Sequence, residues 1–278
     1  MYGAIDLLLA KAFRRLPQDW RQRIEQAYVR LLSMGIGELQ VPTMTEDEIT
    51  ASRELSVIVP VHNAPDETQR CLQSLERFAG AAEIVVVDDG SVDLRARGIV
   101  DQFSARNNWK SHRNDKGNLH SAACMSGAGL ATRPILCLLN SDTVVTQHSW
   151  ALCVQALHEH PDLMAVGPMT SDGGIAQVAI RARRCRFSWS DDQIFWYAEH
   201  LHRRHAAPWP RPLRSFVTGS AFFVRRRDWD RIGGFAGCRP HLGNDVDLCR
   251  KLTADGGWLG VCAGAYIHHL GGGSAVPG

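Results

Sequence analysis

The sequence predicts an α/β fold, a Rossmann-like α/β/α sandwich with a mostly parallel central sheet. Three short runs of β-branched and aliphatic residues, at 55–61, 84–87 and 135–139, have the composition of strands buried on both faces. A helical pattern separates the first two runs. The second and third runs stop at acidic and small polar residues, as strands do when they enter a turn.

The helix between the first two runs is indicated by apolar spacing. Cys71, Leu72, Leu75 and Phe78 share one helical face. Strands that alternate with helices over this length predict βαβ units, in which the helices cover both faces of the sheet.

Composition places the chain among globular proteins. Hydrophobic residues make up 45% and charged residues 22% of its 278 positions, which argues against a disordered or fibrous chain. No run approaches the roughly 18 consecutive apolar residues that a membrane-spanning helix needs. Residues 1–15 carry their basic side chains after an apolar stretch, whereas a secretory signal carries them before it, so we expect a cytoplasmic protein.

Charge and cysteine content limit the classes of partner and of structural site that the sequence predicts. A formal net charge of +2 provides no general field for nucleic acid, so no nucleic-acid partner is expected. Residues 181–231 carry 12 arginines against five acidic side chains, which predicts either a solvated face or a surface that meets an anion such as a lipid headgroup or a phosphorylated substrate. The eight cysteines contain no CxxC pair, which favours a reduced protein without structural zinc or a disulfide framework.

Residues 1–52 form a predicted helical extension before the main domain at 53–278. Apolar residues recur at helical spacing in two stretches of residues 1–35. Residues 38–52 are predicted to be a linker, because they combine Pro42 with an acidic patch. The two helices either pack on the main domain or lie, as a basic amphipathic segment, on the inner face of a membrane.

Three aspartates directly follow predicted strands. Asp88 and Asp89 come after the second run, and Asp142 comes shortly after the third. Because the carboxyl ends of parallel strands form the ligand crevice of an open sheet, these side chains are expected in one cleft. Like charges so close together require a cation or a hydrogen-bonding ligand to offset them. Taken alone, the Asp-Asp-Gly-Ser sequence is also compatible with an ordinary turn and helix cap.

Several short motifs occur in the order and spacing of a known family. They are SVIVPVHN at 56–63, EIVVVDDGS at 83–91, LLNSDT at 138–143, VTGSAFFVR at 217–225, IGGF at 232–235 followed by NDVDLCR at 244–250, and IHHLGGGS at 267–274. Over residues 53–274 the chain therefore resembles the family-2 nucleotide-sugar glycosyltransferases, rhamnosyltransferase-like and inverting, which have the GT-A fold. The resemblance implies transfer of a sugar from a UDP- or dTDP-sugar to a hydroxyl of a glycan or lipid-linked acceptor, as in bacterial surface polysaccharide biosynthesis.

The resemblance also assigns roles to individual residues. Asp245 matches the catalytic base, and Asp142 with His269 matches the metal and diphosphate site. Asp89 matches the carboxylate that accepts a hydrogen bond from the uracil or thymine ring. The predicted nucleotide-sugar-binding residues are Pro60, His62, Asn63, Asp89, Arg113, Asn140, Asp142 and Gly219.

A divalent cation suits the implied reaction, because the leaving diphosphate is dianionic. Mn²⁺ and Mg²⁺ prefer carboxylate, water and phosphate oxygens, so few protein ligands suffice when the substrate supplies the rest. Asp142 and His269 are the predicted metal ligands, and the imidazole favours Mn²⁺ somewhat. His268 is the alternative ligand, and a structural role is the alternative for either histidine.

The acceptor hydroxyl must lose a proton as it attacks the anomeric carbon, and a carboxylate can take it. Asn244 is predicted to cap a helix, which places Asp245 in a first turn where the helix dipole keeps it ionised. Asp247 is expected to face elsewhere and to support the helix start or a neighbouring arginine. Helix capping alone is the alternative for both aspartates. Gly219 is expected either to let the backbone pass close to a substrate or to form a bulge in a central strand.

The chain departs from the family pattern at several positions. His62 stands where the family more often has Tyr or Phe, and Asn140 stands where a full D-x-D element has its first Asp. Residues 117–127 (GNLHSAACMSG) lack the usual Gly-Phe…Asn pattern, and Asn244 replaces the common Glu before the base. No Gln-x-x-Arg-Trp occurs, which argues against a processive cellulose- or chitin-type synthase.

Two other functions share parts of this pattern. A sugar-1-phosphate nucleotidyltransferase has a similar sheet but needs a Gly-rich, Arg-bearing loop after the first strand, where this chain has HNAPDE at 62–67. A non-catalytic nucleotide-sugar or glycan-binding module of a larger assembly is the alternative to an enzyme. Metal-dependent release of nucleoside diphosphate distinguishes the enzyme from the binding module.

Overall fold

The computed structural model describes residues 42–278 except for 118, 174–175, 179–188, 206–208 and 272–278. The two helices predicted within residues 1–35 lie outside the described residues. Among the helices that are described, none combines the length and the apolar character needed to cross a membrane.

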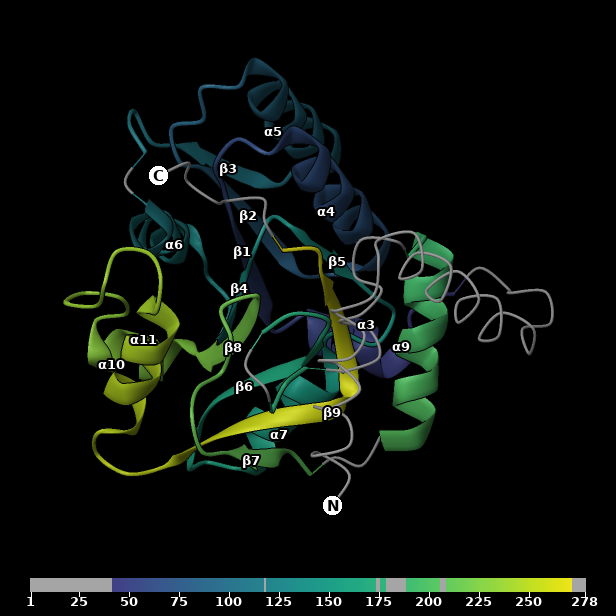
Figure 1. The fold of residues 1–278 in the computed structure, drawn as a ribbon, viewed down its shortest axis with the longest axis vertical. Helices are drawn as coiled ribbons and strands as arrows, with labels where there is room; N and C mark the ends of the chain where they lie inside the picture. Colours follow the sequence, from purple (N-terminus) through teal and green to yellow (C-terminus); the bar gives the residue numbers. More distant parts are fainter. Residues whose placement is uncertain (1–41, 118, 174–175, 179–188, 206–208, 272–278) are drawn as a thin grey trace, which may run out of the picture. The chain divides into compact units, whose positions relative to one another are not determined.

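The described strands form one nine-stranded sheet in the order β3-β2-β1-β4-β8-β6-β9-β5, with β7 pairing β9 (Figure 1). Its parallel half consists of β1 (Leu55–Val61), β2 (Glu83–Asp88), β3 (Lys110–Arg113) and β4 (Ile135–Leu139). The other strands are β5 (Thr143–Val145), β6 (Leu163–Thr170), β7 (Arg211–Leu213), β8 (Ala221–Arg225) and β9 (Trp258–His269).

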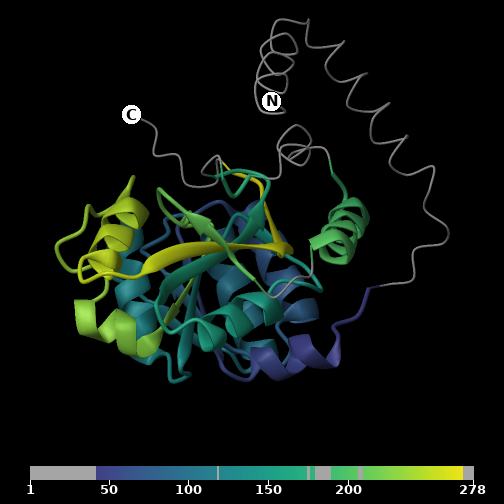
Figure 2. The same cartoon turned by 90° about the horizontal axis from the view of Figure 1, so that it is seen from below.

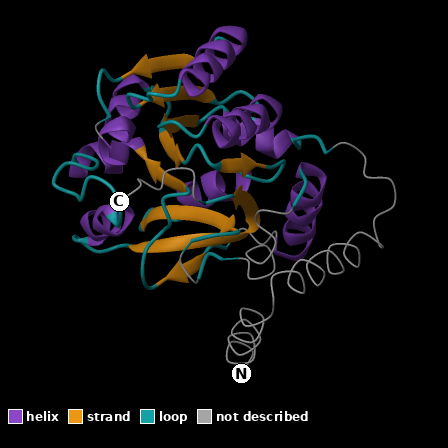
Figure 3. Cartoon of the chain, turned by 45° about the horizontal axis from the view of Figure 1, so that its top comes forward, coloured by secondary structure: helices purple, strands orange, loops and turns teal. Residues whose placement is uncertain are grey.

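Helices cover both faces of this sheet (Figure 3). They are α3 (Glu46–Ser52), α4 (Pro65–Phe78), α5 (Leu94–Asn107), α6 (Leu119–Leu130), α7 (Ala151–Glu159), α9 (Asp191–His205), α10 (Arg226–Ile232) and α11 (Asn244–Thr253). α6 packs on β1 and β2, α7 packs on β6 and β9, and α4 packs on β5. The long strand β9 runs between α11 and α9 (Figure 2).

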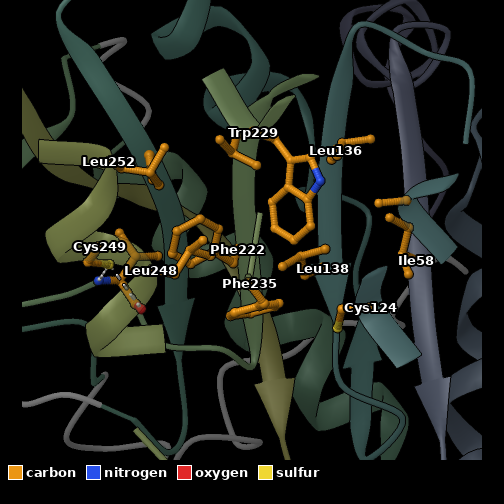
Figure 4. Close-up of a cluster of buried hydrophobic side chains, with 14 of the residues drawn as sticks. Ile58, Cys124, Leu136, Leu138, Phe222, Trp229, Phe235, Leu248, Cys249 and Leu252 are labelled. Carbon is orange, nitrogen blue, oxygen red and sulfur yellow. Dashed lines mark hydrogen bonds between the residues drawn. The ribbon is translucent and has the colours of Figure 1, made fainter. Parts of the chain in front are cut away.

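The hydrophobic core on the α6, α10 and α11 side joins the sheet to these three helices (Figure 4). Ile58 of β1 lies in this core with Cys124 of α6, Trp229 of α10 and Leu248 of α11. α6 approaches the sheet closely at Gly127, where a Cβ would lie 2.4 Å from Cγ2 of Ile58. Alanine at this position would therefore require the Ile58 side chain or α6 to shift.

The α/β fold class and the strands predicted at 55–61 and 135–139 are confirmed. The expected parallel pairing holds for β1 to β4 and for β6 with β9, but β8 is antiparallel to β4 and β6, and β5 and β7 are antiparallel to β9. The direction of a strand depends on the neighbour with which it pairs, and that neighbour is far away in the sequence. Apolar composition predicted the strands at 55–61, 84–87 and 135–139, but it does not predict the direction of a distant strand that pairs with them.

The linker predicted at 38–52 is wrong for its second half, because residues 46–52 form α3, which packs on α7. The Thr45 hydroxyl caps this helix by accepting the N–H of Glu48 at 3.2 Å. Glu48 is itself only 1% exposed, and its Oε2 accepts the N–H groups of Trp150 and Ala151 at the start of α7. A seven-residue helix with an acidic first turn has too little apolar periodicity to be distinguished from a linker.

Glu48 predicts a pH-dependent contribution to stability. Burial raises the pKa of its carboxyl from 4.5 to about 7, against the opposing effect of the two N–H groups that it accepts. Between these values the folded chain holds a proton that the unfolded chain has lost, so the free energy of unfolding falls as pH rises through this window and levels off above it. Glu48→Gln cannot ionise, and we expect it to remove this fall in urea unfolding curves.

Glu46→Gln, an exposed change on the same helix, is the control and should keep the wild-type pH dependence. A Glu48→Gln protein whose stability falls with pH as steeply as that of the wild type would contradict the prediction.

Candidate functional site

A cavity of about 250 Å³ opens at the carboxyl ends of β1, β2 and β4. Five of the predicted binding residues line it, namely Pro60, His62, Asp89, Asn140 and Asp142. They follow three neighbouring strands, and the parallel pairing of β2 and β4 with β1 brings them to one edge of the sheet.

The two aspartates at the end of β2 have different partners. Asp88 accepts the backbone N–H of Ser91 at 2.9 Å and Nε of Arg113 at 2.7 Å, so its carboxylate supports the turn and the edge strand. Asp89 is 3% exposed and lines the cavity, and its Oδ1 accepts Nδ2 of Asn114 at 2.7 Å. Asp89 is therefore the carboxylate that the β2 end presents to the cavity.

Arg113, a predicted binding residue, does not line the cavity. β3 pairs with β2 so that Arg113 lies directly across from Asp88, and its Nη2 also donates to Asp101 at 3.2 Å. The hydrogen bond to Asp88, together with the charge of Asp101, raises the pKa of the guanidinium. The side chain is drawn toward these two carboxylates because they are its nearest opposite charges.

Two hydrogen bonds set the orientation of the His62 ring. Nδ1–H donates to the carbonyl oxygen of Asp89 at 2.9 Å, and Nε2 accepts Nδ2 of Asn63 at 3.1 Å. This assignment follows because Oδ1 of Asn63 accepts the N–H groups of Val92 and Asp93, which leaves its amide nitrogen for His62. Asn63 therefore orients His62 and joins two loops. Although it was a predicted binding residue, it does not line the cavity.

Asp142 and His269 lie in direct contact. The antiparallel pairing of β5 with β9 sets His269 across from Thr143, and Nε2 of His269 lies 3.1 Å from Oδ1 of Asp142. The other ring nitrogen, Nδ1, lies 3.0 Å from the carbonyl oxygen of Asp172. Burial opposes protonation of the imidazole, but the contact with Asp142 outweighs it and raises the pKa of His269.

This pair fits a divalent cation. A carbonyl oxygen can only accept, so the contact with Asp172 keeps a proton on Nδ1 of His269 and directs Nε2, the nitrogen that could ligate a cation, toward Asp142. Two adjacent ligands of an octahedral ion with bonds of about 2.1 Å lie about 3.0 Å apart, close to the 3.1 Å seen here. Within the described residues no group of three or more His, Cys, Asp or Glu side chains surrounds a metal position, so water and substrate oxygens would complete the coordination.

The alternative ligand, His268, lies on the other face of β9, because successive strand residues point to opposite sides. Its Nδ1 is 2.8 Å from the hydroxyl of Tyr266, and its ring stacks on Trp189. The structure therefore places His269, and not His268, against Asp142.

Asp245 lies in the first turn of α11, and two backbone N–H groups hold its carboxylate. Oδ2 accepts the N–H of Gly219 at 3.1 Å, and Oδ1 accepts the N–H of Val246 at 2.9 Å. Asp245 is not among the residues that line the cavity. Gly219, a predicted binding residue, lies in a turn before β8 and does not line the cavity, so the alternative of a bulge within a strand is wrong. Among the described residues, a Cβ there would meet Asp245, at 3.7 Å.

The start of α11 differs in one respect from the prediction. Gly243, with a φ of 79°, is the N-cap, and Asn244 is the first residue of the helix. A left-handed φ is accessible to glycine without steric cost. Asp247 accepts Nε and Nη2 of Arg239 at 2.8 and 2.9 Å, which lowers its pKa to about 2. Asp247 thus supports a neighbouring arginine, as expected.

The cavity also contains residues to which the sequence analysis gave no role, among them Leu119, His120 and His241. Nε2 of His120 lies 3.2 Å from Oδ1 of Asn140. Leu119 has a φ of 69°, a strained conformation for a leucine, at the edge of the cavity. The only feature of the sequence that pointed to this part of the site is the departure of residues 117–127 from the family pattern.

Comparison with known proteins identifies a family. A model of the family described as "Glycosyl transferase family 2" matches residues 56–233. The pre-mycofactocin glycosyltransferases of two Mycobacterium tuberculosis strains, CDC 1551 / Oshkosh and ATCC 25618 / H37Rv, are 25% identical over 266 residues, which is 95% of this chain and 52% of theirs. The chain therefore spans about half the length of the curated relatives it matches.

Solved structures share the fold. GalNAc-T7, crystallised with UDP, GalNAc and Mn²⁺, superposes with a TM-score of 0.58 at 19% identity, over 77% of this chain and 42% of its own. The mannosyltransferase PcManGT from Pyrobaculum calidifontis, in complex with GDP-Man and Mn²⁺, superposes with a TM-score of 0.54 at 16% identity, over 99% of this chain and 70% of its own. S. aureus TarS 1-349 gives a TM-score of 0.53 at 16% identity, over 78% and 60%.

Replacing Asp142 should weaken Mn²⁺ binding. The amide oxygen of Asp142→Asn keeps the shape of the side chain but lacks the negative charge that attracts a hard cation. We expect the Mn²⁺ dissociation constant, measured by calorimetry with UDP present, to rise by about tenfold or more. Asp162→Asn, an exposed change outside the cavity lining, should leave it unchanged. Equal affinity in Asp142→Asn and wild type would remove Asp142 from the metal site.

Proposed function

This chain belongs to glycosyltransferase family 2, and on that premise we propose that it transfers a sugar from a nucleotide diphosphate to an acceptor hydroxyl, with inversion at the anomeric carbon. The observation that carries the proposal is the meeting, in one cavity, of His62 and Asp89 with Asp142, the partner of His269. A base-binding end and a diphosphate-binding end are the two requirements of a nucleotide-sugar site.

A uracil or thymine ring suits the carboxylate of Asp89. Either base offers a single ring N–H between two carbonyl groups, whereas guanine offers adjacent N–H donors that engage both oxygens of a carboxylate. Oδ1 of Asp89 already accepts the amide of Asn114, which disfavours the two-point pairing of guanine. The solved relatives hold UDP in one case and GDP-Man in another, so they support a nucleotide-sugar donor without selecting its base.

Asp142 and His269 would hold the divalent cation, Mn²⁺ or Mg²⁺, which when bound neutralises charge on the leaving diphosphate. Support comes from the 3.1 Å contact between them and from the two solved relatives that contain Mn²⁺. The carbonyl of Asp172 holds the His269 ring in the tautomer that keeps Nε2 available.

Asp245 is the proposed general base. The N–H of Gly219 and that of Val246 each take one carboxylate oxygen, so the side chain is held in one orientation while it remains able to accept a proton from the acceptor hydroxyl. Asp247, two residues further, is bound on both oxygens by Arg239. A single base opposite the leaving group implies in-line displacement.

The acceptor is proposed to be a glycan or lipid-linked hydroxyl in the cytoplasm. Contact of the basic N-terminal segment with a membrane stays a prediction, because the helices predicted within residues 1–35 lie outside the described residues. A nucleotide-sugar-binding module without catalysis is the alternative function. Metal-dependent release of UDP from a UDP-sugar tests the two, since a binding module releases none.

Asp245→Asn should reduce turnover by about 10²–10⁴-fold, because the amide keeps the shape of the side chain but cannot accept the proton. Donor affinity should stay close to that of the wild type, since the nucleotide contacts lie in the cavity around Asp89 and Asp142. Asp247→Asn is the matched control and should cost far less turnover, because its side chain is occupied by Arg239. If Asp247→Asn is the inactive variant, the assignment of the base is wrong.

Asp89→Ala should weaken UDP binding by about 1.5–3 kcal/mol, the range for a hydrogen bond to a charged group. Calorimetry with UDP and Mn²⁺ measures the change. Asp93→Ala, in the same loop but outside the cavity lining, is the control. Unchanged UDP affinity in Asp89→Ala would show that the Asp-Asp-Gly-Ser segment serves as a turn and does not bind the nucleotide.

A further inference from the structure

A line of hydrogen bonds joins the end of β4 to the first turn of α11 through His120. Nε2 of His120 lies 3.2 Å from Oδ1 of Asn140, and Nδ1 lies 2.9 Å from Nδ2 of Asn244. The N–H of Asp245 then donates to Oδ1 of Asn244 at 2.8 Å. We call these three bonds the His120 relay. It begins at a residue of the cavity and ends at the proposed base.

Donor and acceptor chemistry fixes the direction of each bond. The backbone N–H of Asp245 can only donate, so Asn244 turns Oδ1 toward it and Nδ2 toward His120 and the hydroxyl of Ser121. An amide nitrogen can only donate, so Nδ1 of His120 carries the lone pair. The ring proton is therefore on Nε2 and is donated to Asn140.

The surroundings of His120 favour this neutral ring. Burial lowers the pKa of His120, and the charge of His241 lowers it further. The hydrogen bond to Asn140 and the charges of Asp245 and Asp142 oppose this change. A protonated ring would set Nδ1–H against the amide donor that it now accepts. The relay is therefore intact only when His120 is neutral.

The segment before α11 is already attached to the start of α6. The N–H of Ser121 donates to the carbonyl of Pro240 at 3.2 Å, and the Ser121 hydroxyl donates to the carbonyl of Arg239 at 3.0 Å. His120 connects the same two helix starts to Asn140 at the end of β4, and thus to the cavity. Two departures from the family pattern, at residues 117–127 and at Asn244, thus contact each other directly.

We propose that His120 is a positioning residue, which holds the first turn of α11, and with it the carboxylate of Asp245, in place relative to the donor cavity. The proposal rests on the proposed role of Asp245 as the base. The catalytic proton does not pass through the relay, because its last member is a backbone N–H.

Three variants separate the two ends of the relay. In His120→Asn the side-chain amide can place an acceptor near the position of Nδ1, so the bond from Asn244 can form. In His120→Gln the amide reaches the position of Nε2, so the donor to Asn140 remains while the acceptor for Asn244 is lost. His120→Ala loses both. Gly129→Ala, on α6 where a Cβ would meet nothing within 4 Å, is the matched control.

Two measurements test the proposal. The first is release of UDP from UDP-glucose with Mn²⁺ and water as the acceptor, with kcat and the donor KM determined separately. His120→Gln and His120→Ala should lower kcat by about tenfold or more with little change in KM, since misplacing a reacting group acts on the chemical step. His120→Asn should recover most of this loss, and Gly129→Ala should match the wild type.

The second measurement is hydrogen exchange at the amide of Asp245, which needs no turnover. Exchange should be roughly three- to tenfold faster in His120→Gln and His120→Ala, the factor that corresponds to one hydrogen bond, and unchanged in His120→Asn. If the wild type does not turn over UDP-glucose, the proposed function fails for this donor while the exchange result still decides the relay. Unchanged exchange in His120→Gln, or a raised donor KM with unchanged kcat, would overturn the proposal.

Discussion

The burial of three carboxylates at one edge of the parallel half of the sheet is the constraint on which the site depends. Asp88, Asp89 and Asp142 are 1%, 3% and 6% exposed, and an uncompensated buried charge is costly. Each carboxylate has a different polar partner: Arg113 for Asp88, an asparagine amide for Asp89 and His269 for Asp142. These separate partners let one carboxylate support the edge strand while the other two face the cavity.

The change from parallel to antiparallel pairing supplies the rest of the site. β1, β2 and β4 bring the residues of the cavity together, but β5 and β9 must pair in opposite directions to set His269 against Asp142. β8 lies antiparallel to β4, and the turn before it brings Gly219 to Asp245. The proposed diphosphate site and the proposed base therefore both depend on strands whose direction is set by tertiary pairing.

Asparagine side chains orient much of the polar surface around the cavity. Asn63 accepts two backbone N–H groups and donates to His62, Asn114 donates to Asp89, and Asn244 joins His120 to α11. In two of these cases a backbone N–H fixes which end of the amide accepts. His62 and His120, the histidines beside these two asparagines, are thereby each held in a single tautomer, which is the form in which they face the cavity.

The sequence by itself determined three strands of the sheet, at 55–61, 84–87 and 135–139, and the residues at their ends. Asp88, Asp89 and Asp142 were predicted for one cleft, because an apolar run and the polar residue that stops it are local features of the chain. Asp89 and Asp142 line one cavity, whereas Asp88 is bonded to Ser91 and Arg113 outside its lining. Only the tertiary structure decided that Arg113 pairs with carboxylates outside the cavity, that His269 rather than His268 meets Asp142, and that β8 is antiparallel. Each of these depends on which distant segment packs alongside, and the partner of a strand or of a polar side chain is not encoded in the residues next to it.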